Sequence, residues 1–125
     1  MKSNPVGWFE IYVQDIDRAI KFYESVFECE LQELNAPVPG RELFAFPMEQ
    51  AQYGASGALV KIDEFPSGGN STIVYFQCED CSVEESRVVN SGGRIECPKM
   101  AIGEYGFISL IIDTEGNMIG LHSMQ

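Results

Sequence analysis

A strand, an acidic cap and a helix follow one another twice along this chain of 125 residues, at the same relative positions. The first copy leaves its strand through Val13-Gln14-Asp15 and the second through Cys78-Glu79-Asp80. An Asp directly before a run of helical periodicity is a favoured N-cap. Three further short apolar runs, separated by glycine and proline, follow each helix and are typical of strands. The sequence therefore predicts a single α+β domain over residues 1–125, built from two tandem βαβββ modules at about 5–63 and 71–124.

Periodicity sets the expected bounds of the elements. In the first module we expect strands at 8–13, 31–34, 42–48 and 57–62 and a helix at 17–27, whose apolar residues recur at three- and four-residue spacing. In the second module we expect strands at 73–78, 94–96, 107–112 and 118–123 and a helix at 83–89. The segment 64–70 is rich in glycine and polar residues, so we interpret it as a linker and hinge.

The last two strands form a predicted hairpin around the turn at 113–117, in which Gly116 can take the positive φ of a bulged turn. Alternation along the second strand directs apolar residues to one face and a mixed set to the other, namely Ile119 and Leu121 against Met118, Gly120 and His122. His122 is the only histidine of the chain. It either faces a cavity or is a half-exposed structural residue, and the sequence leaves both open.

The composition narrows the range of partners. Nineteen acidic residues against eight basic ones give a formal net charge of −11, and no cluster of Lys or Arg could follow a phosphate backbone. We therefore expect no nucleic acid partner, and the acidity either forms a solvated surface or suits a cationic ligand. No stretch reaches the roughly eighteen apolar residues of a membrane span, and the N-terminus lacks the apolar core of a signal peptide. We expect a cytoplasmic protein without membrane association.

Four cysteines occur at Cys29, Cys78, Cys81 and Cys97, and the Cys78-x-x-Cys81 spacing occurs in redox and zinc motifs. A four-thiolate zinc site usually contains a second close pair, whereas Cys29 and Cys97 are isolated. Cys78 also falls on the apolar side of its predicted strand, where a reduced cysteine packs as a small hydrophobic residue. We therefore interpret the pair as structural.

The chain resembles the vicinal oxygen chelate superfamily, which includes glyoxalases, bleomycin resistance proteins and extradiol dioxygenases. The resemblance rests on the duplication, on the Asp-Ile-x-x-Ala-x-x-Phe-Tyr pattern ending at Tyr23, and on the Asp-x-Glu-Gly-Asn-x-Ile-x-Leu pattern from Asp113 to Leu121. It implies two βαβββ modules whose sheets curl into a half-open barrel, with the helices outside. It also implies a small-molecule ligand inside the barrel and a homodimer.

The metal positions that the resemblance implies are not occupied by metal ligands in this chain. Metal-dependent members carry a histidine seven residues before the Asp that ends the first strand and a glutamate just before the Leu of the closing strand. Those places hold Trp8 and Gly120, and the equivalent place in the second module holds Ile73. Because none of the three is a usual metal ligand, we expect no metal and no other cofactor.

Two polar residues lie two positions further along the predicted strands that contain Trp8 and Gly120, and we take them as the candidate catalytic residues. Glu10 is two residues past Trp8 and His122 is two residues past Gly120, so each stays on the cavity face. We therefore expect Glu10 and His122 to be neighbours. Three interpretations remain open: a carboxylate–imidazole pair with His122 as general base, a displaced divalent metal site, or a polar pair that only shapes the pocket.

The predicted cavity wall supplies the candidate ligand-binding residues. It is aromatic and polarizable, which suits a small, partly apolar ligand, although aromatic residues in a small barrel often serve only as filling. A loop at 98–106 with glycines at its end could close over a ligand, with Lys99 meeting an anionic group and Tyr105 stacking on it, or could be an ordinary connection. The candidates are Trp8, Tyr12, Phe46, Met48, Tyr75, Gln77, Lys99 and Tyr105.

These patterns favour a small-molecule-binding or enzymatic protein of the glyoxalase/bleomycin-resistance type that lacks the standard metal ligands. One alternative is a metal-dependent lyase or dioxygenase that uses a displaced site. The other is a non-catalytic protein that sequesters a drug, for which an acidic cavity and a dimer suffice.

Overall fold

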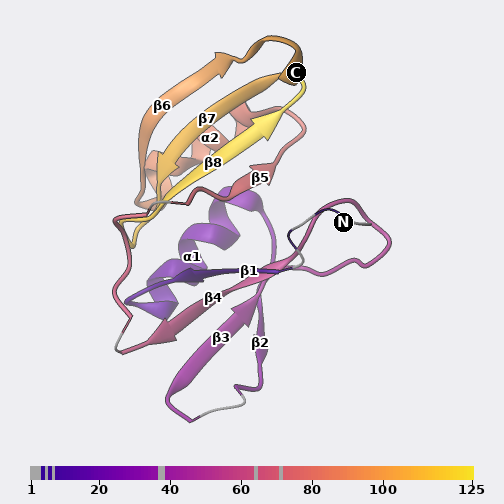
Figure 1. The fold of residues 1–125 in the computed structure, drawn as a ribbon. Coiled ribbons are helices and arrows are strands. Elements are labelled where there is room, and N and C mark those ends of the chain that lie inside the picture. The colour runs from indigo at the N-terminus through magenta and orange to yellow at the C-terminus, as the bar shows by residue number, and fades with distance from the viewer. Residues whose placement is uncertain (1–3, 5, 7, 37–38, 64, 71) are drawn as a thin grey trace.

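The computed structural model describes residues 4, 6, 8–36, 39–63, 65–70 and 72–125. Within these residues two four-stranded sheets are accompanied by two α-helices (Figure 1). The first module contains β1 (Phe9–Tyr12), α1 (Ile16–Phe27), β2 (Gln32–Leu34), β3 (Arg41–Ala45) and β4 (Gly57–Ile62). The second contains β5 (Tyr75–Gln77), α2 (Cys81–Val88), β6 (Arg94–Ala101), β7 (Phe107–Ile112) and β8 (Met118–Ser123), with short 3₁₀ turns at Val89–Ser91 and Gly103–Tyr105.

Both sheets have the same topology, which confirms the predicted α+β fold of two βαβββ modules. The strand orders are β1-β4-β3-β2 and β5-β8-β7-β6. In each sheet the first strand pairs in parallel with the last, and the other pairs are antiparallel. The two sheets do not join into one closed barrel, so the arrangement is half open.

The N-terminal end of α1 is set by the side chain that the sequence analysis assigned to it. Asp15 is the N-cap, and its Oδ1 accepts a hydrogen bond from the amide of Arg18 at 3.1 Å. The helix ends at Glu28, which takes a left-handed conformation with φ 50°. Its buried face consists of Ile16, Ala19, Phe22, Tyr23 and Val26.

One hydrophobic core serves both modules. The buried face of α1 belongs to the same cluster as Leu59 of β4, Ile111 of β7 and Leu121 of β8. Tyr23 lies at its centre and makes ring contacts with Phe46 and Phe76, at centroid distances of 5.5 and 6.0 Å. Because residues of both sheets contact this helix, the two modules share one core.

The turn between β7 and β8 binds the first module through Glu115, whose side chain is fully buried. Oε1 of Glu115 accepts hydrogen bonds from the amides of Gln14 and Asp15, both at 2.9 Å. The guanidinium of Arg18 donates to both carboxylate oxygens, at 2.7 and 3.0 Å. Glu115 therefore satisfies backbone donors at the start of α1, a helix of the other module.

Asp113 organises the same turn from inside the core. Its Oδ1 accepts from the amides of Glu115 and Asn117, both at 2.8 Å, and its Oδ2 accepts from the hydroxyl of Tyr23 at 2.7 Å. Gly116 takes φ 82°, the positive φ that the sequence predicted for this turn.

The two buried carboxyls of this turn have pKa values shifted in opposite directions. Burial alone would raise the pKa of Glu115, but hydrogen bonds from Arg18, the amides of Asp15 and Gln14, and Thr114 outweigh it and lower the pKa to about 2. For Asp113 burial is the largest effect and raises the pKa, although its hydrogen bonds oppose the rise. Burial, followed by the charge of Asp113, raises the pKa of Tyr23 well above its usual value, so Tyr23 keeps its proton and donates it to Asp113.

The linker is bonded to the second module instead of forming a free hinge. Ser67 Oγ donates to the carbonyl of Glu115 at 2.6 Å, and the amide of Gly68 donates to Oδ1 of Asn117 at 2.7 Å. Asn70 pairs with the backbone of Met118 through a donor and an acceptor, at 2.7 and 3.2 Å. These hydrogen bonds attach residues 67–70 to the turn before β8 and to its first residue, while residue 64 lies outside the described residues.

The strand β6 differs most from its predicted bounds. A strand was expected only at 94–96, because Pro98 and the glycines that follow are typical of a loop. Instead β6 runs to Ala101 and pairs with β7, with register shifts between Ile95 and Cys97 and between Cys97 and Met100. Irregular pairing of this kind accommodates a proline that cannot donate a hydrogen bond within a strand.

Candidate functional site

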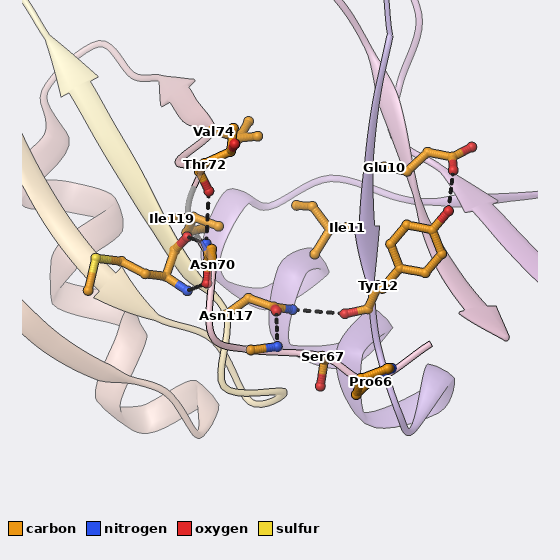
Figure 2. Close-up of a pocket in the computed structure, with 12 residues that line it drawn as sticks. Glu10, Ile11, Tyr12, Pro66, Ser67, Asn70, Thr72, Val74, Asn117 and Ile119 are labelled. Carbon is orange, nitrogen blue, oxygen red and sulfur yellow. Dashed lines mark hydrogen bonds between the residues drawn. The ribbon is translucent and has the colours of Figure 1, made fainter. Parts of the chain in front are cut away.

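A cavity of about 220 Å³ lies at the seam between the two modules, and we call it the seam cavity (Figure 2). One wall is β1, and the other consists of the linker, the residues before β5 and the start of β8. The lining residues are Glu10, Ile11, Tyr12, Pro66, Ser67, Gly68, Asn70, Thr72, Val74, Asn117, Met118 and Ile119. β1 is an edge strand of the first sheet, so its side chains can line a cavity together with residues of the linker and the second module.

Glu10 and Tyr12 form the polar group on the β1 side of the cavity. The Tyr12 hydroxyl donates to Oε1 of Glu10 at 2.8 Å, and Nε1 of Trp8 donates to Oε2 at 3.3 Å. The hydrogen bond from Tyr12 to Glu10 is the largest cause of a raised Tyr12 pKa, so Tyr12 keeps its proton and remains a donor. The Tyr12 ring also stacks on Phe65 at 5.1 Å. The carboxylate is therefore fixed in orientation by two aromatic donors.

Two asparagines hold the opposite wall. Asn117 Nδ2 donates to the carbonyl of Tyr12 at 2.9 Å, and its Oδ1 accepts from Gly68, so one side chain joins β1, the linker and β8. Figure 2 shows Asn70 and Asn117 on the side of the cavity away from Glu10. Sequence reasoning did not select Asn70, Thr72 or Asn117. For Asn117 the available signal was its place directly before β8, at the end of the polar turn 113–117, whereas no such signal marked Asn70 or Thr72.

The expected contact between Glu10 and His122 is not found. Among the hydrogen bonds and ion pairs of the described residues, none joins the two side chains. Nε2 of His122 lies 2.7 Å from the carbonyl oxygen of Tyr105, an acceptor, so Nε2 carries a proton and donates it. Glu10 lies on β1 of one sheet and His122 on β8 of the other, and His122 does not line the seam cavity.

Phe46 does not face the seam cavity, although we expected it on the wall of the ligand cavity. Its side chain is buried on the helix side of the sheet and contacts Phe9, Tyr23 and Phe76. The reason is register, because β3 places Leu43 and Ala45 opposite Val60 and Ala58, and so leaves Phe44 and Phe46 for the core face. Met48 follows the end of β3 and is 56% exposed. Phe46 and Met48 border a separate cavity of about 330 Å³ beside β2.

Tyr75 and Gln77 were expected on the cavity wall, but they are exposed residues of β5 and neither lines the seam cavity. Tyr75 pairs with Gly120 and Gln77 with His122. A Cβ at Gly120 would overlap the Tyr75 ring, so the ring lies directly across this glycine. The place where the resemblance implies a metal-binding glutamate is therefore covered by an aromatic side chain.

Lys99 and Tyr105 do not belong to one open loop. Lys99 lies on β6, where its Nζ donates to Asp80 at 2.9 Å and sits 4.6 Å from the centre of the Phe107 ring. The Lys99 hydrogen bond is the largest cause of an Asp80 pKa lowered to about 2. Lys99 is thus engaged with its own module. Tyr105 ends a 3₁₀ turn and its side chain is 67% exposed.

The three positions at which the family pattern places metal ligands have different environments. The Trp8 indole bonds to Glu10, Ile73 is 37% exposed, and Gly120 supports Tyr75. Across the described residues, no group of three or more His, Cys, Asp and Glu side chains is placed to hold a metal ion. Within the same residues, no helix is both long and apolar enough to cross a membrane.

Comparisons with known proteins agree with this architecture. No family model matches the chain. A glyoxylase-like domain-containing protein of Didymella fabae is 25% identical over 114 residues, which cover 90% of this chain and 88% of the relative. The CFP32 protein of Mycobacterium tuberculosis, whose name assigns it provisionally to the glyoxylases, is 28% identical over 92% of this chain. The chain spans only 44% of the length of CFP32.

A solved structure from Sphaerobacter thermophilus, described as a member of the glyoxalase/bleomycin resistance protein/dioxygenase superfamily, superposes with a TM-score of 0.74 at 20% identity. The superposition covers 98% of this chain and 99% of the Sphaerobacter thermophilus chain. The chain therefore has the fold of that solved structure, as its sequence pattern predicted, and its sequence is similar to those of glyoxylase-like proteins.

Proposed function

We propose that this protein binds a small molecule in the seam cavity and that Glu10 and Tyr12 are its polar contacts. The support is a carboxylate oriented at a cavity wall by two aromatic donors, opposite a wall fixed by Asn70 and Asn117. Fixed polar groups on an otherwise apolar wall are typical of ligand sites. The four free cysteines fit a reducing compartment, and we place this function in the cytoplasm.

The chemistry of the walls limits the ligand. The volume of about 220 Å³ is below the roughly 300 Å³ at which drug-sized sites begin, so we expect a small ligand. Ile11, Val74 and Ile119 would contact an apolar part of it. The Glu10 oxygens only accept hydrogen bonds when ionised, so the group beside them should be a donor, and the net charge of −11 favours a cationic one.

To test this proposal, a panel of small amines and their uncharged analogues is screened by thermal shift, and the affinity of each hit is then measured by calorimetry. Glu10→Gln keeps the side-chain shape and removes the charge, and we expect it to weaken binding by about tenfold to a hundredfold, the size of one charge-assisted hydrogen bond. Glu49→Gln, an exposed glutamate that does not line the cavity, is the matched control. Equal affinity of wild type and Glu10→Gln would contradict the proposal.

A catalytic version of the same site is the second candidate, because a carboxylate held in one orientation can also act as a general base. It predicts that Glu10→Gln abolishes turnover of a bound compound while the compound still binds. Binding without turnover in the wild type would instead favour sequestration. His122 remains a candidate site residue only if His122→Ala changes ligand binding or turnover without loss of stability.

We further propose a homodimer. Tyr75 of the edge strand β5 is 47% exposed, and a second copy would cover this ring and the open sheet edge beside it. Light scattering should give twice the chain mass of 13.9 kDa at micromolar concentration. A monomer under these conditions would count against it.

We also propose that the purified protein carries no stoichiometric zinc, nickel or iron. The support is chemical, because Trp8, Ile73 and Gly120 are not metal ligands. Elemental analysis measures this directly. One tightly bound ion per chain that is lost in Glu10→Ala would show that a displaced metal site exists.

A further inference from the structure

We propose that Cys97 and Met100 form a binding site for a monovalent soft metal ion such as Cu(I). Sγ of Cys97 lies 3.5 Å from Sδ of Met100. Thiolate and thioether sulfur are the donors that Cu(I) prefers over the harder divalent ions. The pair lies on β6, away from the seam cavity, so this site is independent of the ligand-binding function proposed above.

The irregular strand is what brings the two sulfurs together. Residues three apart in a regular strand point to opposite faces, so Cys97 and Met100 would be separated by the sheet. In β6 the register shifts between them, with Cys97 opposite Leu110 and Met100 opposite Ile108. Leu110 and Ile108 are two residues apart on β7 and share one face, so the irregularity places both sulfurs on that face.

Hydrogen bonds from neighbouring elements hold the irregular segment in place. The amide of Lys99 donates to Oε1 of Glu85 at 2.6 Å, and Ser109 Oγ reaches both that carboxylate, at 2.8 Å, and the carbonyl of Cys97, at 3.1 Å. Lys99 Nζ is tied to Asp80. The backbone between the sulfurs is therefore fixed from α2 and β7, which reduces the entropy lost when an ion binds.

Cys97 differs from the other cysteines in being both accessible and next to a second soft donor. Cys81 is fully buried, and burial raises the pKa of the Cys78 thiol to about 12, so that this thiol stays protonated. Met100 is 46% exposed and Cys97 is half-buried, so an ion can reach the pair. Binding transfers the Cys97 thiol proton to solvent and forms sulfur–metal bonds, with no change of oxidation state.

Anaerobic titration of the full chain with Cu(I), in competition with a chromophoric Cu(I) chelator, tests the site. We expect one equivalent to bind with an affinity that rises with pH, because the thiol must lose a proton. Met100→Leu keeps the volume and removes the thioether, and we expect affinity to fall by about tenfold or more, the loss that removing even an outer-shell partner can bring. Cys97→Ser should abolish this equivalent.

Cys29→Ser and Met48→Leu are the matched controls, since each alters a partly exposed sulfur residue on another part of the surface. Both should bind like wild type, and circular dichroism should confirm that all four variants are folded. If Met100→Leu binds as tightly as wild type, Cys97 acts as an ordinary thiol and the two-sulfur site does not exist. Loss of binding in Cys29→Ser would also overturn the assignment.

Discussion

Glu115→Gln is expected to lower the free energy of unfolding by on the order of 3 kcal/mol at pH 7, the range for removing one partner of a buried ion pair. The side chain is fully buried and accepts bonds from two backbone amides and from Arg18. An amide of the same shape offers one acceptor where the carboxylate offered two, and it turns an NH₂ group toward donors. Urea unfolding, with the slope checked for constancy, measures the loss.

Arg18→Gln serves as the comparison, because it removes one partner and keeps the carboxylate. The Arg18 side chain is 52% exposed, and the amides of Gln14 and Asp15 would still bind Glu115. We therefore expect a smaller loss than for Glu115→Gln. If both variants lose the same amount, the ion pair and not the helix start accounts for the stability.

The pH dependence has a definite sign. The pKa of Glu115 is lowered to about 2, so its contribution is complete above the usual glutamate pKa and is lost as the pH falls from about 5 towards 2. The raised pKa of Asp113 acts in the opposite direction, because the folded state takes up its proton more readily. Wild type should therefore lose stability over this range more steeply than Glu115→Gln. Parallel pH profiles would contradict the assignment to Glu115.

Gly57→Ala is expected to cost about 3 kcal/mol. A Cβ at Gly57 would overlap the carbonyl oxygen and ring of Phe9, the residue opposite it on β1. The Phe9 ring contacts Phe46 and Phe76 in the core, at 5.7 Å each, so it cannot move aside without disturbing them. Overpacking of a core commonly costs 1–3 kcal/mol, and the backbone overlap here favours the upper end. Thermal and urea unfolding measure the effect.

Gly120→Ala is the matched control on the equivalent strand of the second module. Its Cβ would meet only side-chain atoms of Tyr75, which is 47% exposed and can rotate into solvent. We expect a loss below about 1 kcal/mol together with a changed Tyr75 environment, visible as a shift of its ring resonances. Equal losses in the two variants would show that backbone overlap at Phe9 is not the determining factor.

The fold could be predicted from sequence because its determinants are local. Asp15 and Asp80 cap the two helices, and the polar turn with Gly116 closes the last hairpin, each within a few residues of the element it defines. The extent of β6 could not be predicted in this way. Its pairing depends on β7 and on Glu85 of α2, while Pro98 by itself favours a loop.

The candidate site was predicted only in part, because cavity walls are assembled from distant segments. Alternation correctly placed Glu10 and Tyr12 together, since both lie on one strand. It placed Phe46 on the wrong face, because the facing of β3 is set by its register with β4. Asn117 contacts Tyr12 across 105 residues, and a single sequence contains no signal for such a pair.

The capping of α1 by Glu115 also bears on the order in which the chain can fold during its synthesis. α2 is held at its start by Asp80 and Ser123 of its own module, whereas α1 has its own cap Asp15 but also needs Glu115 of the other module for the amides of Gln14 and Asp15. A ribosome completes the first module long before it reaches residue 115. While the second module is being made, the amides at the start of α1 therefore lack their acceptor Glu115. The core face of the first module likewise lacks its contacts with Ile111 and Leu121. The first half of the nascent chain would be the part that most needs protection from premature association.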